Sequence, residues 1–123
     1  IKIMAETKNV LILEDNSMMC NLLKTLLDLE GFNVICPTFP LMDILKVIKD
    51  SRSDAILMDI NLPGLNGLEI LKMIRNSDDI NSIKVIIISG SDRKKESIEA
   101  GADHFLMKPY MPDELIQILK NLS

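Results

Sequence analysis

The sequence is poor in cysteine and lacks any long apolar run. Only Cys20 and Cys36 occur among its 123 residues. Because no secretory signal opens the chain, we expect two reduced thiols that pack in the core, and not a disulfide. No apolar run approaches the roughly 20 residues that a membrane-spanning helix requires. These absences predict a cytoplasmic domain that does not use a membrane as a partner.

The sequence also lacks an excess of basic residues. Its formal net charge is −4, which argues against direct contact with nucleic acid, because such a surface would show clustered Lys and Arg. A length of 123 residues is typical of one domain. The letters IKI before Met4 look like an upstream extension or a remnant of cloning. We therefore expect an N-terminal extension over residues 1–8 and one domain over residues 9–123.

Five short apolar runs recur along the chain. They are VLILED (10–15), NVICP (33–37), AILMD (55–59), KVIIIS (84–89) and HFLMK (104–108). Runs of this length without polar alternation are typical of strands that helices cover on both faces, as in a parallel sheet.

Apolar residues at helical spacing fill the intervals. The predicted helices cover 17–30, 41–50, 68–76 and 93–100, and the last one begins at Pro112 and runs through Leu119. Asn16 or Ser17 is placed to cap the first helix, and Ser91 or Asp92 the fourth. The methionines, Met18 and Met19 among them, fall mostly at apolar positions, so we expect them in the core. This alternation predicts an α/β fold with a doubly wound, five-stranded parallel sheet and five helices.

Polar residues stand at the carboxyl ends of four strands, where ligands bind in such sheets. Glu14 and Asp15 close the first strand, Asp59 the third, Ser89 the fourth and Lys108 the fifth. Taken alone, each has an ordinary structural reading as a helix cap, a turn residue or a solvated amine. The only histidine, His104, begins the last strand, at the opposite end of the sheet, so we expect a surface or packing role for it.

Together these groups suit one chemistry. Three neighbouring carboxylates raise one another's pKa unless a cation joins them, and an all-oxygen donor set selects a hard ion such as Mg²⁺. Lys108 would pair with Asp59 or with an anion attached to it, and Ser89 would offer a hydroxyl to the same anion. The set predicts a phosphoryl-transfer site with Asp59 as the nucleophile.

The motifs at these strand ends resemble those of the receiver domain of two-component response regulators. They are LEDN (13–16), MDINLPGLNG (58–67), IISGS (87–91), GAD (101–103) and FLMKPY (105–110). The resemblance covers nearly all of residues 10–122. It implies the flavodoxin-like strand order 2-1-3-4-5 and a signalling domain that is not an enzyme.

The resemblance also implies a role for each matching residue. Asp59 corresponds to the aspartate that a histidine kinase or histidine phosphotransfer protein phosphorylates. Asp15 would bind Mg²⁺ directly, Glu14 through water, and Asn61 through its backbone carbonyl. Ser89 corresponds to the switch hydroxyl and Lys108 to the family's lysine, which precedes a typically cis proline.

Phe105 falls on the switch aromatic of the family, in place of a frequent tyrosine. The resemblance implies that phosphorylation reshapes the face formed by strand 104–108 and the helices that flank it. That face would bind an effector domain or protein, and the charged stretch DRKKE (92–96) is equally consistent with partner docking, a homodimer face or plain solvation.

Two other classes share features of this pattern. A Mg²⁺-dependent phosphatase with an aspartyl nucleophile usually needs a second acid two residues beyond the first, where this chain has Asn61. A flavodoxin-type module needs a Ser/Thr/Gly-rich phosphate loop after the first strand, where this chain has EDNSMM (14–19).

Overall fold

The computed structural model describes residues 8–122 and confirms the predicted sheet. Its parallel strands are β1 (Asn9–Leu13), β2 (Asn33–Ile35), β3 (Ala55–Asp59), β6 (Lys84–Ser89) and β7 (His104–Met107). They lie in the order β2-β1-β3-β6-β7, which is the expected 2-1-3-4-5. Of the extension expected over residues 1–8, all but Lys8 lies outside the described residues.

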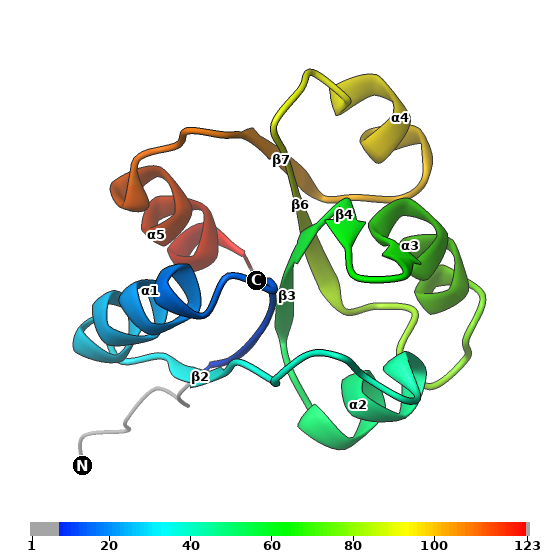
Figure 1. Cartoon of the computed structure of the whole chain (residues 1–123), viewed down its shortest axis with the longest axis horizontal. Coiled ribbons are helices and arrows are strands. Elements are labelled where there is room, and N and C mark those ends of the chain that lie inside the picture. The colour runs from blue at the N-terminus through cyan, green and yellow to red at the C-terminus, as the bar shows by residue number, and fades with distance from the viewer. Residues whose placement is uncertain (1–7, 123) are drawn as a thin grey trace, which may run out of the picture.

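The predicted helices are also present. They are α1 (Ser17–Leu29), α2 (Ile44–Ser51), α3 (Gly67–Arg75), α4 (Lys94–Glu99) and α5 (Pro112–Asn121). Helices α1 and α5 cover one face of the sheet and α2 and α3 the other, while α4 packs beside β7 (Figure 1). Every residue of β3 is buried, because the central strand has helices on both sides, and this explains its unbroken apolar run.

Several element ends differ from their predicted positions. Strand β1 ends at Leu13 and β7 at Met107, so the charged groups that follow them lie in loops. Asn16 caps α1, since its side chain accepts a hydrogen bond from the Met19 N–H. The expected cap of α4 at Ser91 or Asp92 was wrong: Arg93 is the N-cap residue and makes no side-chain cap hydrogen bond, although the Asp92 carboxylate accepts one from the Lys94 N–H at 3.2 Å. Helix α2 begins only at Ile44, where Asp43 caps it.

A short antiparallel hairpin was not predicted. Strands β4 (Asn61–Leu62) and β5 (Leu65–Asn66) pair with each other directly after β3. Gly64 makes the turn with φ of 68°, a left-handed conformation that glycine adopts without a steric cost. The hairpin sets the distance between Asp59 and the start of α3.

The prediction that the methionines fill the core was wrong. Among the described methionines only Met58 belongs to the buried core, whereas Met18 is 81% and Met19 39% exposed. Helix α1 buries the face that carries Cys20, Leu23 and Leu27. Met18, Met19, Leu22 and Leu29 are exposed, because one helix face is enough to cover the sheet.

Within residues 8–122, none of the helices combines the length and the apolar character that crossing a membrane requires.

Candidate functional site

Asp59 is a buried carboxylate at the end of the central strand. It is only 5% exposed, and burial of a charge is costly unless polar partners surround it. Its Oδ1 accepts a hydrogen bond from the Asn61 N–H at 2.9 Å. Its Oδ2 is in contact with the ammonium group of Lys108. Both oxygens therefore have polar partners.

Lys108 reaches Asp59 from the loop that follows β7. The Lys108 N–H donates to the Ser89 carbonyl at 2.8 Å, which fixes the loop against β6, and the Lys108–Pro109 peptide is cis, as expected. Its Nζ also lies 3.6 Å from Glu14 Oε2. Burial alone would lower the pKa of Lys108, but the hydrogen bond and charge of Asp59, with the charge of Glu14, raise it.

The two acids after β1 occupy different environments. Asp15 is exposed, whereas Glu14 is 5% exposed. Glu14 Oε1 accepts a hydrogen bond from the Asn16 N–H at 3.2 Å, while its Oε2 is buried without a hydrogen-bond partner. Burial raises the pKa of Glu14, and the Asn16 N–H and the Lys108 charge offset only part of that rise.

Ser89 ends the strand next to β3 and is 2% exposed. Asp59 stands opposite Ile88 in the parallel ladder, so Ser89 lies one residue beyond it at the same edge. The Ser89 hydroxyl accepts a hydrogen bond from the Ser91 N–H at 3.2 Å. Phe105 pairs with Ile87 in the next strand and is half-buried against the core on the α3 side.

The structure thus brings Glu14, Asp59, Ser89 and Lys108 together at one edge of the sheet, whereas Phe105 lies near the start of β7, away from that edge. His104, as expected, is an exposed residue at the other end of β7.

The donor set at this edge fits Mg²⁺. All its charged ligands are carboxylates, and Glu14 Oε2 is a buried acceptor in need of a partner. No three His, Cys, Asp or Glu side chains within residues 8–122 are already positioned around a common point. Mg²⁺ usually keeps several waters and takes only one or two carboxylate ligands from the protein.

Gly67 lies directly against the backbone of Asp59 and Ile60. The sequence alone did not reveal this contact. The Gly67 N–H donates to the Ile60 carbonyl at 2.8 Å. A Cβ atom at this position would lie 2.5 Å from the Asp59 carbonyl oxygen and 2.9 Å from the Ile60 Cα. Glycine is therefore required where α3 approaches the backbone at the end of β3.

A groove adjoins the site between α1 and the loop after β7. Its cavity measures about 590 Å³. It is lined by Glu14 and Lys108 on the site side and by Met19, Leu22, Leu23, Pro109, Tyr110 and Pro112 on the apolar side. The sequence did not predict this groove, because the outward apolar residues of α1 were assigned to the core.

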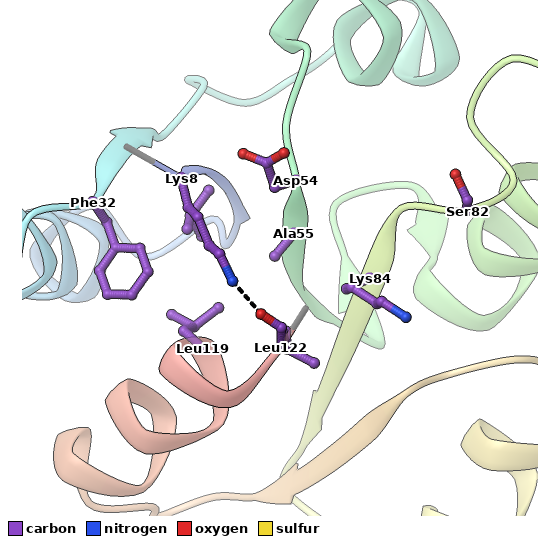
Figure 2. A pocket seen from close by; sticks show the side chains of 9 residues that line it. Lys8, Phe32, Asp54, Ala55, Ser82, Lys84, Leu119 and Leu122 are labelled. Carbon is purple, nitrogen blue, oxygen red and sulfur yellow. Dashed lines mark hydrogen bonds between the residues drawn. The ribbon is translucent and has the colours of Figure 1, made fainter. Parts of the chain in front are cut away.

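A second cavity, of about 220 Å³, lies at the opposite edge of the sheet (Figure 2). The Lys8 ammonium there donates to the Leu122 carbonyl at the end of α5. Phe32, Ala55 and Leu119 supply apolar lining, and Asp54 and Lys84 stand at its rim. None of the predicted site residues lines this cavity.

Comparison with known proteins gives a consistent result. The sequence profile of the family described as "Response regulator receiver domain" matches residues 10–120. The polar-differentiation response regulator DivK of Brucella anthropi is 32% identical over 117 residues, which are 93% of this chain and 94% of DivK. A solved putative response regulator of Chloroflexus aurantiacus has a TM-score of 0.85 at 27% identity and covers 95% of this chain and 98% of its own.

A further similar structure contains a metal. It is the receiver domain of the sensor histidine kinase PA1611 of Pseudomonas aeruginosa, solved with a magnesium ion coordinated in its active site cleft. It is 26% identical, has a TM-score of 0.77 and covers 95% of this chain and 98% of its own.

Proposed function

Because this chain belongs to the family of response regulator receiver domains, we propose that it is a phosphorelay protein whose Asp59 accepts a phosphoryl group from a phosphohistidine. One observation carries the proposal. Asp59 is a buried carboxylate at the carboxyl end of the central strand, with a lysine ammonium on one oxygen and a backbone N–H on the other. Lys108 is thereby placed to bind the oxygens of an incoming phosphoryl group beside Asp59.

The residues that would hold Mg²⁺ are Asp15, Asp59 and the backbone carbonyl of Asn61, with Glu14 acting through water. When bound, the ion neutralises charge on the phosphoryl oxygens. The orphaned Glu14 Oε2 supports this assignment, since a water of the ion's shell would satisfy it.

In the transfer, a carboxylate oxygen of Asp59 forms a bond to phosphorus as the phosphorus–nitrogen bond of the donor breaks. The electron pair of that bond returns to the imidazole of the donor. Lys108 and Ser89 then bind the oxygens of the attached group, and Lys108 exchanges its ion pair with the Asp59 carboxylate for one with the phosphoryl group.

Phosphorylation changes a nearby face through Ser89 and Phe105. If Ser89 moves toward the phosphoryl group, the half-buried Phe105 gains room to turn inward. Phosphorylation would thereby shift the equilibrium between an outward and an inward position of Phe105. The face of β7, α4 and α5 carries exposed Met107 and Ile98. It is the proposed site for an effector domain or protein, or for a second copy of this chain.

The proposed donor is a histidine kinase or a histidine phosphotransfer protein in the cytoplasm, and neither nucleic acid nor a membrane is a direct partner. A donor must pass the rim of the site to reach Asp59, so the apolar groove between α1 and the loop after β7 would contact it. The family match argues against the phosphatase and flavodoxin alternatives.

The test is phosphorylation by a small phosphodonor with Mg²⁺, read by intact mass. The wild type should gain one phosphoryl group of about 80 Da, and Asp59→Asn should gain none. Asp113→Asn, at an exposed acid in the first turn of α5, is the matched control and should be modified like the wild type. Modification that persists in Asp59→Asn would overturn the proposal.

The metal assignment has its own test. Asp15→Ala should lose Mg²⁺-dependent phosphorylation and keep the circular dichroism spectrum of the wild type, because Asp15 is exposed and packs against nothing in the core. Unchanged phosphorylation of this variant would refute its assigned role.

A further inference from the structure

The only two cysteines of the sequence lie next to each other in the fold. Cys20 belongs to α1 and is 6% exposed, whereas Cys36 follows β2 and is half-buried. Both line one cavity of about 170 Å³ and pack in the same apolar cluster. Two residues 16 positions apart, on separate elements, are thus brought together by the packing of α1 on β2.

The two thiols interact and are reduced. Both cysteines are free, and the Cys20 thiol donates to the Glu14 carbonyl at 3.4 Å. Burial raises the pKa of both thiols, and each lies close enough to the other to alter its pKa further. A peroxide that enters the shared cavity would meet Cys36 first, because Cys20 is the more deeply buried of the two.

We propose that Cys20 and Cys36 form a reversible dithiol–disulfide site that a peroxide oxidises. The peroxide first converts the more accessible Cys36 thiol to a sulfenic acid and releases one water. The Cys20 thiol then attacks that sulfur, the sulfur–sulfur bond forms, and a second water leaves. The two thiols lose two electrons in total, and the peroxide gains them.

The location of the pair links it to the phosphoacceptor site. Glu14, Asp15 and Ser17 line the same cavity as the two cysteines. A disulfide would tie α1 to the loop after β2 and restrict the segment that carries the two acids. We therefore expect oxidation to slow Mg²⁺-dependent phosphorylation, a consequence that depends on the function proposed above.

The first experiment tests the disulfide and does not involve phosphorylation. The full chain is treated with hydrogen peroxide, denatured, alkylated and weighed, with and without a reductant. The wild type should lose both alkylatable thiols, and the reductant should restore both. In Cys36→Ser, Cys20 should keep its thiol, because it is the more deeply buried of the two and has no partner.

Two outcomes would overturn the disulfide. One is wild-type protein in which both thiols survive the treatment. The other is addition of oxygen atoms to each cysteine independently, with the same masses in the wild type and in the single variants Cys20→Ser and Cys36→Ser.

The second experiment compares phosphorylation of oxidised, reduced and re-reduced protein by the same small phosphodonor. Oxidised wild type should be phosphorylated several-fold more slowly, and re-reduction should restore the rate. Cys36→Ser should be insensitive to peroxide. A disulfide that forms without slowing phosphorylation would overturn the coupling alone, whereas reduced protein that is never phosphorylated would count against the proposed function alone.

Discussion

Lys108 and Asp59 are 49 residues apart, yet they form an ion pair across the carboxyl edge of the sheet. The pair is asymmetric, because the Lys108 side chain is 39% exposed and that of Asp59 only 7%. Glu14 stands 3.6 Å from the same ammonium group. One partly solvated cation therefore compensates two buried carboxylates, which would otherwise repel each other.

Replacement of Lys108 should destabilise the fold. Lys108→Met leaves Asp59 buried without its cation, and we expect the free energy of unfolding at neutral pH, without metal, to fall by about 1–2 kcal/mol. This is less than the loss for a fully buried pair, because solvent already screens Lys108. Urea unfolding measures the effect.

A double variant and a control separate charge from packing. Asp59→Asn should be better tolerated in the Lys108→Met background than in the wild type, since there it removes an uncompensated charge. Lys120→Met disrupts the exposed pair with Glu30 and should cost no more than about 0.5 kcal/mol. If Lys108→Met and Lys120→Met are equally mild, the buried pair does not stabilise the fold.

The buried Glu14 should give the stability a distinct pH dependence. Its pKa in the folded protein is raised from the ordinary value of 4.5, so the folded state binds this proton more tightly than the unfolded chain. The contribution of Glu14 to the free energy of unfolding therefore falls as pH rises from 4.5 through the raised folded value.

Glu14→Gln should remove this dependence. The free energy of unfolding of the variant, minus that of the wild type, should be larger at pH 7 than at pH 4. The reason is that the amide has no charge to bury, and its oxygen can still accept a hydrogen bond from the Asn16 N–H. Urea unfolding in a metal chelator at both pH values measures the difference. A variant that loses stability relative to the wild type between pH 4 and pH 7 would contradict the prediction.

The sequence predicted the five strands and the edge at which their polar residues gather, because both depend on local signals, whereas the strand order followed from the resemblance to receiver domains. Apolar runs identify the strands, and parallel strands place their carboxyl ends at one edge, so Asp59, Ser89 and Lys108 could be brought together without a structure. What could not be predicted depends on packing between distant segments. The exposure of the Met18 side chain is one case. The spacing of apolar residues alone does not say which of the two apolar faces of α1 packs on the sheet.

Arg75 is a second case of a role that no local pattern reveals. Its guanidinium donates to the carbonyls of Gly101, Asn81 and Ile83 and pairs with Asp103. These contacts tie the end of α3 to the segments that enter β6 and β7. They join residues up to 28 positions apart, so only the folded structure identifies them.

Gly67 offers the sharpest test of how the fold holds Asp59 in place. In Gly67→Ala the new methyl group would meet backbone atoms of Asp59 and Ile60 at 2.5 and 2.9 Å, which cannot move as a side chain can. We expect a loss of about 1–3 kcal/mol in the free energy of unfolding. Phosphorylation by a small phosphodonor should also slow, because α3 must shift away from Asp59 or displace it.

Gly90→Ala is the matched control, since a Cβ there meets nothing within 4 Å, and it should remain within about 0.5 kcal/mol of the wild type. Equal behaviour of the two variants in both assays would mean that the close approach of α3 does not position Asp59.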